Sequence, residues 1–342
     1  MTNNIKAVGF YQHLPISDVK SFEDIELTVP TVGGHDLLVR VDGVSVNPVD
    51  VGVRKGGRPK PLKHPKVIGW DAVGTVIDTG SEVSLFAKGD RVWYAGDFTK
   101  SGSDAQNQVV DERIVGHAPK NLDDESAAAV PLVGLTAYES LFEKLHITWG
   151  NNADKTILII NGAGGVGSMA VQLAKLAGLK VIATASRPDS VAWVEQLGAD
   201  EVIDHHQDLV KQVHALGLQY VDYVLNLNNL DAHWDEIAEV IKPNGMIAAT
   251  TENHRLIDLQ KLTKKRATFA WEWMYSKSYY QVDLESQHEI LDEIAKLYED
   301  GKLQTLDKIH YSPINAENMR KAHADVESGK MVGKVVLTGW EK

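Results

Sequence analysis

A glycine-rich turn carries the clearest chemical signal in this sequence. Gly162-Ala163-Gly164-Gly165-Val166-Gly167 satisfies the pattern G-x-G-x-x-G, and it stands between the apolar run 156–161 and the amphipathic run 168–177. A strand, such a turn and then a helix form the context in which a dinucleotide pyrophosphate binds. Gly162 permits the tight turn, Gly164 lets the backbone approach the phosphates, and Gly167 lets the helix pack against the strand. The alternative is a tight strand-to-helix turn without a ligand.

The residues after the next strand indicate which dinucleotide binds. An NAD site usually places Asp or Glu about 20 residues beyond the turn, where the acid binds the ribose 2′-hydroxyl. Here the strand 181–184 is followed by Ala185-Ser186-Arg187, and no acid comes before Asp189. Ser186 can hydrogen-bond a 2′-phosphate, and Arg187 can pair with it through two charge-assisted bonds. The sequence therefore predicts NADPH, the alternative being that Arg187 only covers the surface.

Composition excludes several classes of protein. The 342 residues fit two domains, no apolar run approaches the roughly 20 residues that span a bilayer, and residues 1–9 lack the apolar core of a signal peptide. We therefore expect a cytoplasmic protein with no membrane partner. The net charge of −12 argues against nucleic-acid binding. The absence of cysteine excludes disulfides, a cysteine nucleophile and thiolate ligands to a metal.

The order of predicted elements indicates an α/β protein with two domains. Residues 1–125 contain short strands and many glycines, including a strand at 37–45 and a bent strand at 67–76, and they predict a small β-barrel. Residues 126–284 open with one helix, from 126 to 145, and then alternate strands with helices. That alternation predicts a doubly wound parallel sheet. Residues 285–342 return to mixed elements that complete the first domain.

Several further motifs stand in the same order and spacing as those of a known family. They are Asn47-Pro48-Val49-Asp50, Gly69-Trp70-Asp71-Ala72-Val73-Gly74, Leu135-Thr136-Ala137-Tyr138, Gly198-Ala199-Asp200 and Gly333-Lys334-Val335-Val336-Leu337. With the Gly162 turn, they resemble the medium-chain dehydrogenase/reductase superfamily in its quinone oxidoreductase (zeta-crystallin-like) branch, and most closely the zinc-type alcohol dehydrogenase-like proteins. The resemblance implies a GroES-like barrel, a Rossmann NADP-binding domain, a cofactor cleft between them, and a homodimer or homotetramer.

The resemblance also implies roles for individual residues. Asn47 lies near the nicotinamide and Asp50 orders its loop, while Thr136 approaches the nicotinamide or its phosphate. The remaining cofactor-binding residues implied are Gly162, Gly164, Gly165, Val166 and Gly167 at the pyrophosphate, Ser186 and Arg187 at the 2′-phosphate, Asn226 at the adenosine or ribose, and Lys334 in the returning tail.

The sequence does not carry the zinc ligands of the zinc-dependent members of this family. Those members use Cys, His and Cys, and the corresponding positions here are Asn47, Trp70 and Leu132. The histidines show no metal-binding spacing, and the adjacent pair His205-His206 is interpreted as surface or core histidine. We therefore predict no bound metal.

Without a Lewis acid to deprotonate an alcohol, the chemistry that remains favoured is hydride transfer from NADPH to a quinone or an enone, a small molecule that carries its own electron sink. The alternatives are a zinc-type alcohol or aldehyde dehydrogenase, and a cofactor-binding protein without turnover.

The proton donor is harder to identify from sequence. Tyr94 is a candidate and Tyr11 is another, although for each the favoured interpretation is a packing aromatic. Trp70 and Trp93 are expected to line the substrate pocket, and residues 271–275 either cap that pocket or form a subunit contact.

Overall fold

The computed structural model describes residues 4–57 and 60–341, and the chain divides into two compact units. Unit 1 comprises residues 1–132 and 275–342, and unit 2 comprises residues 133–274. The sequence-based boundaries lie at 125/126 and 284/285. Each unit is described below by itself.

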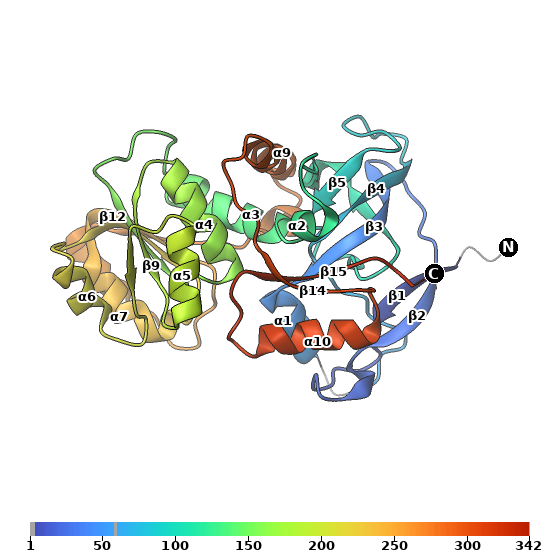
Figure 1. Cartoon of the computed structure of the whole chain (residues 1–342), viewed down its shortest axis with the longest axis horizontal. Helices are drawn as coiled ribbons and strands as arrows, with labels where there is room; N and C mark the ends of the chain where they lie inside the picture. Colours follow the sequence, from blue (N-terminus) through green and yellow to red (C-terminus); the bar gives the residue numbers. More distant parts are fainter. Residues whose placement is uncertain (1–3, 58–59, 342) are drawn as a thin grey trace. The chain divides into compact units, whose positions relative to one another are not determined.

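Unit 2 is built around a six-stranded parallel sheet with the order β10-β9-β8-β11-β12-β13. Figure 1 shows α4 and α5 on one side of this sheet and α6 and α7 on the other. Both features confirm the predicted doubly wound fold. The elements of the sheet and its helices are β8 (Thr156–Ile160), α4 (Gly165–Leu176), β9 (Lys180–Thr184), α5 (Pro188–Gln196), β10 (Glu201–Ile203), α6 (Leu209–Ala215), β11 (Val221–Asn226), α7 (Leu230–Val240), β12 (Ile241–Ala249) and β13 (Thr268–Trp271).

The composition of the central strands explains their position. All five residues of β8, TILII, are buried, as expected of a parallel strand that is covered by helices on both faces. The α6 and α7 face forms one apolar cluster in which Leu158, Ile182 and Trp234 take part. Burial of such side chains contributes about 1.5–3 kcal/mol each, so these strands are the rigid part of the unit.

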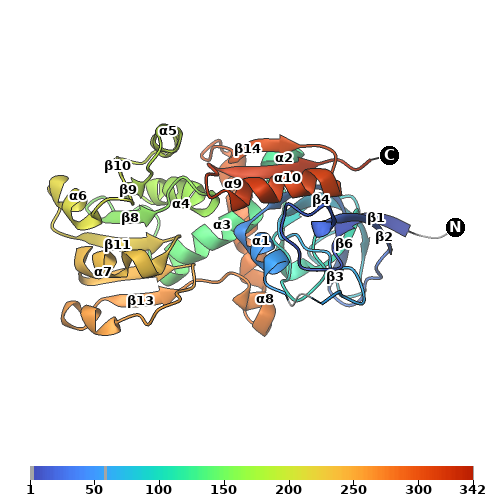
Figure 2. The same ribbon diagram turned by 90° about the horizontal axis from the view of Figure 1, so that it is seen from below.

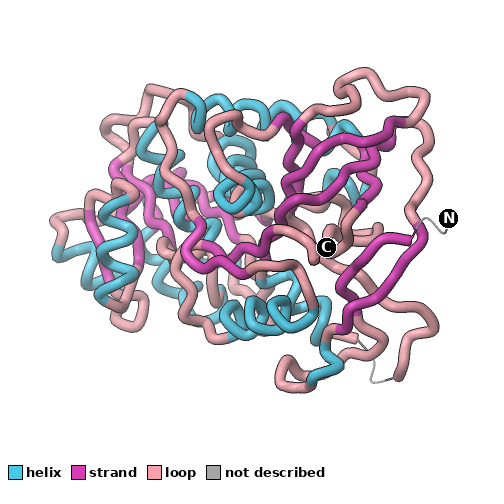
Figure 3. The backbone as a smooth tube through the Cα atoms, turned by 45° about the vertical axis from the view of Figure 1, so that its right-hand side comes forward, coloured by secondary structure: helices cyan, strands magenta, loops and turns pink. Residues whose placement is uncertain are grey.

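Unit 1 contains a seven-stranded sheet, in which six strands follow the order β14-β15-β3-β4-β5-β7 and β6 pairs with β3. A separate antiparallel ribbon, β1–β2, runs close to the label N in Figure 3. The strands are β1 (Asn4–Gly9), β2 (Glu23–Thr28), β3 (Asp36–Val46), β4 (Ala72–Thr79), β5 (Arg91–Tyr94), β6 (Asn107–Asp111), β7 (Val115–His117), β14 (Asp307–Tyr311) and β15 (Lys334–Thr338). The helices are α1 (Pro48–Lys55), α2 (Asp124–Ala128), α8 (Ser276–Tyr280), α9 (Glu285–Glu299) and α10 (Ala316–Glu327).

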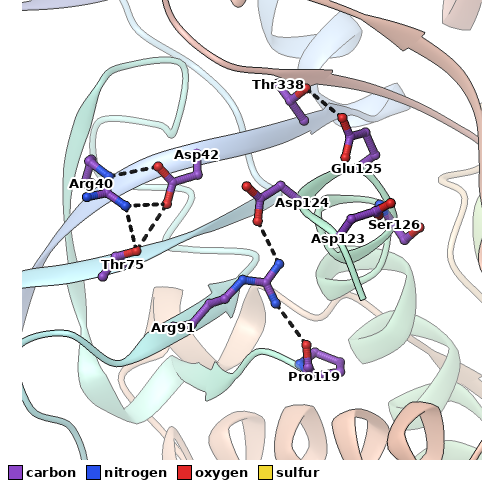
Figure 4. A network of polar contacts seen from close by, with 10 residues as sticks. All are labelled: Arg40, Asp42, Thr75, Arg91, Pro119, Asp123, Asp124, Glu125, Ser126 and Thr338. Atoms are coloured by element: carbon purple, nitrogen blue, oxygen red, sulfur yellow. Dashed lines mark hydrogen bonds and ion pairs between the residues drawn. The ribbon is translucent and has the colours of Figure 1, made fainter. Parts of the chain in front are cut away.

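Strand β15 ties the late part of the chain to the early part of the same unit. It pairs antiparallel with β3, with Val335 opposite Val46. Polar side chains reinforce this region: Thr338 on β15 donates a hydrogen bond to Glu125 at 3.2 Å, and Arg91 on β5 donates one to Asp124 at 2.7 Å (Figure 4). The returning tail is therefore a structural part of unit 1.

Two predicted elements differ from the structure. The predicted strand 67–76 begins only at Ala72, because Gly69 has a φ of +111° and turns the chain before the ladder starts. The predicted helix 126–145 is interrupted: α2 ends at Ala128, α3 spans Pro131–Tyr138, and a π-helical segment, η3, follows at Glu139–Lys144. Pro131 causes the first break, since proline lacks an N–H and disfavours a helical conformation of the preceding residue.

Candidate functional site

The glycine turn of unit 2 has the geometry expected of a phosphate-binding turn. Asn161 has a φ of +68°, Gly164 is the N-cap of α4, and the helix begins at Gly165. A Cβ atom built on Gly167 would lie 2.2 Å from the carbonyl oxygen of Asn161, and one on Gly162 would lie 2.8 Å from the Cβ of Ala183. Both glycines are required for close packing, and the α4 N-terminus offers unpaired N–H groups to an anion.

The turn lies at the switch point of the sheet. Strand β8 has β9 on one side and β11 on the other, and the chain leaves β8 and β11 toward opposite edges. Such a point is where open α/β sheets bind ligands. Gly162 follows β8, and Asn226 ends β11 at the same edge. Asn226 is buried, its Nδ2 lies 3.4 Å from Thr251 Oγ1, and its Oδ1 accepts no hydrogen bond from any described residue. That oxygen is suited to accept a ligand hydroxyl.

Ser186 and Arg187 follow β9 directly, at this same edge of the sheet. Arg187 is the N-cap residue of α5, its side chain is 38% exposed, and its Nε lies 3.4 Å from Asp189 Oδ1. Ser186 lines an open pocket of about 490 Å³ beside β10, together with Asp204 and Gln212. Thr136 lies nearly buried on α3. The residues predicted to bind the 2′-phosphate thus stand next to the turn, and their role, like that of Thr136, stays a prediction.

Unit 1 contains a buried polar cluster, formed by Ser45, Asn47, Asp71 and Lys334. The pairing of β15 with β3 places Lys334 beside Asn47, and Lys334 Nζ donates to Asn47 Oδ1 and, at 3.0 Å, to Asp71 Oδ2. Asn47 Nδ2 and Ser45 Oγ each donate to the same Asp71 oxygen at 2.7 Å. The other oxygen, Oδ1, accepts the backbone N–H of Leu132 at 2.7 Å. Asp71 and Lys334 therefore form a buried ion pair. Both carboxylate oxygens of Asp71 accept hydrogen bonds.

Two further carboxyl groups lie next to this cluster. Asp50 Oδ2 accepts the backbone N–H of Asn47 at 2.6 Å, as the predicted ordering role requires. Burial raises the pKa of Asp50 to about 7, while the Asn47 N–H and the Lys334 ammonium oppose that shift. Burial and the neighbouring Asp50 also raise the pKa of Asp104 well above its usual range. Burial therefore favours the protonated form of both carboxyl groups.

The positions that correspond to zinc ligands hold groups unsuited to zinc. Asn47 is bonded to the Lys334 ammonium, Leu132 contributes only its backbone N–H, and Trp70 stacks on Phe98 with ring centroids 5.1 Å apart. A fixed ammonium repels a cation, and none of the three side chains is a zinc ligand. In the part of the chain that the structure describes, no three His, Asp or Glu side chains are grouped so as to hold a metal ion.

The aromatic candidates separate into two groups. Trp70 also lies 6.3 Å from Tyr275, whose raised pKa reflects burial and the nearby Asp50 and Asp71. Trp93 and Tyr94 instead point into the interior of unit 1. Trp93 packs on Tyr298, and the pKa of Tyr94 is raised by burial and by Asp42, not by a member of the polar cluster. The buried hydroxyl of Tyr94 has no hydrogen-bond partner among the described residues, and its role as a proton donor stays a prediction.

Sequence reasoning gave no role to Ser45, a member of the cluster, or to Asp104, and it named Tyr275 only within residues 271–275, which were expected to cap the pocket or form a subunit contact. Tyr275 stands among the aromatic residues 271–275, but it is separated from Asn47 by more than half the chain, and only tertiary structure joins them. Ser45 is two residues before Asn47 on β3 and shares its face of the strand, a signal that was available.

Comparisons with known proteins agree with this architecture. Residues 33–129 match the alcohol dehydrogenase GroES-like domain, and residues 165–288 match the zinc-binding dehydrogenase family. A zinc-type alcohol dehydrogenase-like protein of Staphylococcus epidermidis is 39% identical over 97% of this chain and 99% of its own length. A chloroplastic quinone-oxidoreductase homolog of Spinacia oleracea is 29% identical over 93% and 94%.

A solved structure gives the same result. An alcohol dehydrogenase superfamily protein from Novosphingobium aromaticivorans superimposes with a TM-score of 0.85 at 28% identity, covering 98% of this chain and all of its own. Among the described residues, none of the helices has the length and apolarity to cross a bilayer. Two domain matches in the expected order, with a relative aligned over nearly the full length, establish that this chain is a medium-chain dehydrogenase/reductase, an oxidoreductase of the group that contains the zinc-type alcohol dehydrogenase-like proteins and the quinone oxidoreductases.

Proposed function

We propose that this protein is a zinc-independent, NADPH-dependent reductase of quinones or of conjugated carbonyl compounds. The observation that carries the proposal is the Lys334 ammonium bonded to Asn47 and Asp71, since Asn47 is one of the positions at which the family resemblance implies a ligand in zinc-dependent members. A reaction that needs a Lewis acid for alcohol deprotonation is disfavoured by that arrangement. A conjugated acceptor has a weaker requirement, since hydrogen-bond donors suffice to stabilise its developing oxyanion.

The cofactor would be held by residues of unit 2. The turn Gly162–Gly167 and the α4 N-terminus would bind the pyrophosphate, Asn226 Oδ1 would accept a ribose hydroxyl, and Ser186 with Arg187 would bind the 2′-phosphate. When bound, NADPH supplies the hydride. Absence of an acid between β9 and Asp189 favours this cofactor over NADH.

Asn47 would stabilise the oxygen of the acceptor. Its Nδ2 has two hydrogens, one of which is directed at Asp71, and the other is available for a carbonyl oxygen. The Lys334 ammonium on Asn47 Oδ1 polarises the amide and strengthens its N–H as a donor. Trp70, stacked on Phe98, offers a flat apolar surface for a planar acceptor.

The test is turnover by metal-analysed protein. NADPH oxidation is measured with 1,4-benzoquinone and with an enone, and NADP⁺ reduction is measured with primary alcohols, before and after treatment with a chelator. We expect reduction of the first two classes to persist without zinc. Stoichiometric zinc and alcohol oxidation that the chelator abolishes would instead establish an alcohol dehydrogenase. Tight NADPH binding with no turnover of any class would establish a binding protein.

Asn47→Ala separates the proposed donor from cofactor binding. Loss of one oxyanion donor lowers kcat by about 10²–10³-fold, and the Kd for NADPH should stay within twofold. The matched control is Asn4→Ala, which removes an exposed amide of the same unit that donates to Glu26 Oε2 at 3.0 Å. Equal kcat for Asn47→Ala and the control would refute the assignment of Asn47.

We further propose a homodimer or homotetramer that forms through the sheet of unit 2. Strand β13 lies at an edge of that sheet, and its last residue, Trp271, is 46% exposed. An edge strand has unpaired backbone groups that a second copy can pair with. Light scattering of the wild type and of Trp271→Lys tests this: a wild-type monomer at micromolar concentration would contradict the proposal.

A further inference from the structure

A group of cationic and titratable side chains lies at the carboxyl ends of β9 and β10. The two strands are parallel neighbours with Thr184 opposite Ile203, and Ala185 N–H donates to Ile203 O at 3.0 Å. Residues 185–187 therefore leave the sheet beside residues 204–206, which are Asp204, His205 and His206. Figure 2 shows β9 and β10 side by side, with α5 next to them. This register places His205 next to the predicted 2′-phosphate residues, Ser186 and Arg187.

The imidazole of His205 is placed to respond to an added anion. Its ring lies 4.3 Å from that of His206, and its buried Nδ1 has no hydrogen-bond partner among the described residues. The charged groups that act on it are Arg187 from the β9–α5 turn, His233 from α7, and Asp204 and His206 from its own turn. Of these, Arg187 and His233 each have an acidic neighbour, at 3.4 and 3.3 Å.

This environment favours the neutral form of His205. Burial is the largest cause that lowers the pKa of His205, followed by His206, with Asp204 opposing and His233 and Arg187 adding to the shift. A phosphate dianion beside the ring would reverse the balance, because an opposite charge within a few ångströms stabilises the imidazolium. Binding of such an anion would then be coupled to uptake of a proton.

We propose that His205 is a proton-linked specificity residue for the 2′-phosphate, so that discrimination between NADPH and NADH strengthens as pH falls from 8 to 6.5. This inference rests on the proposed function, because it assumes that the 2′-phosphate binds at Ser186 and Arg187. The doubly protonated ring would donate one N–H to the phosphate, in addition to the guanidinium of Arg187. The pair of histidines that the sequence left as surface or core residues thereby gains a role at the cofactor site.

The direction and size of the expected pH dependence follow from the coupling between phosphate binding and proton uptake. A group that takes up one proton on binding changes the affinity by up to about tenfold per pH unit between its two pKa values. We expect the ratio of Kd for ADP to Kd for adenosine 2′,5′-bisphosphate to rise about five- to tenfold from pH 8 to pH 6.5 in the wild type. ADP has no 2′-phosphate, so its own affinity should change little over this range.

Calorimetric titration with adenosine 2′,5′-bisphosphate and with ADP, in two buffers of different ionisation enthalpy, measures the proton uptake. His205→Gln should remove the extra uptake at pH 7 and flatten the pH profile of the ratio. The ligand phosphate titrates near pH 6 as well, and the difference between wild type and variant cancels that contribution. His214→Gln is the matched control, since His214 is an exposed histidine of the same unit. If His205→Gln does not fold, ¹³C-labelled histidine in the wild type reports the same titration by NMR.

The titrations test the role of His205 separately from the specificity for NADPH. A bisphosphate preference that is independent of pH, or an uptake that is unchanged in His205→Gln, overturns the role of His205 and leaves NADPH specificity intact. Equal affinity for ADP and the bisphosphate at every pH overturns the NADPH assignment itself.

Discussion

Asp50 gives the sharpest prediction of how this protein responds to pH. The side chain is completely buried at the start of α1, and burial raises the pKa of its carboxyl to about 7 from 3.8. In the unfolded chain the group titrates near 3.8, so between the two values the folded state alone holds the proton. Stability therefore falls as pH rises from about 4, by about 1.4 kcal/mol per unit, and levels off above 7. The total contribution that is lost is about 4 kcal/mol.

Asp50→Asn should remove this dependence. The amide oxygen can still accept the Asn47 N–H that Asp50 accepts now, while no ionisation occurs. The free energy of unfolding of the variant, relative to the wild type, should increase by about 3 kcal/mol between pH 5 and pH 8. Urea unfolding at the two pH values, followed by fluorescence and by amide hydrogen exchange in α1, measures the difference.

The control is Asp300→Asn, which removes an exposed carboxylate of the same unit that pairs with Lys302 at 3.3 Å. Its stability relative to the wild type should change by less than about 0.5 kcal/mol over the same range. A pH-independent difference between Asp50→Asn and the wild type would show that Asp50 is already ionised in the folded protein, and the electrostatic account of the cluster would be wrong.

Three further substitutions test other parts of the argument. Arg187→Glu should weaken adenosine 2′,5′-bisphosphate at least tenfold by calorimetry, because a favourable charge becomes a repulsive one; unchanged affinity would place the phosphate elsewhere. Gly167→Ala puts a Cβ 2.2 Å from Asn161 O and should lower stability by about 1–3 kcal/mol and weaken NADPH binding, as thermal unfolding and fluorescence titration can establish. Lys334→Met leaves Asp71 buried without its counter-ion and should cost about 3–5 kcal/mol, whereas adding Asp71→Asn should restore part of it; a double variant no more stable than Lys334→Met would contradict the ion-pair account.

The sequence was most informative where local pattern and tertiary role coincide. The glycine turn was predictable because one short segment contains the strand, the turn and the helix. Ser186 and Arg187 could then be located by their distance in sequence from that turn. The break at Pro131 was also readable in principle, yet the apolar residues on both sides favour one continuous helix. The late start of the predicted strand 67–76 depends on residues elsewhere in the chain: Gly69 turns the chain where a Cβ would lie 2.6 Å from Ser103 and Asp104.

The polar cluster of unit 1 was predictable only in part. The resemblance named Asn47, Asp50 and Lys334 one by one, but it did not indicate that a lysine bonds the asparagine. Nor did it indicate that Asp71 neutralises that lysine. Such contacts depend on the register of β15 against β3, which joins residues separated by the whole of unit 2. The donor role of Tyr94, whose ring is buried in unit 1, stays a prediction.

The position of β15 has a consequence for biosynthesis. All of unit 2 is translated between the two segments of unit 1, so its sheet can form while the sheet of unit 1 still lacks β14 and β15. Until Lys334 leaves the ribosome, Asp71 has no cation to accompany it into the interior. The polar cluster is therefore expected to form late in biosynthesis. A chain that ends before β15 should be retained by chaperones, with unit 2 already folded.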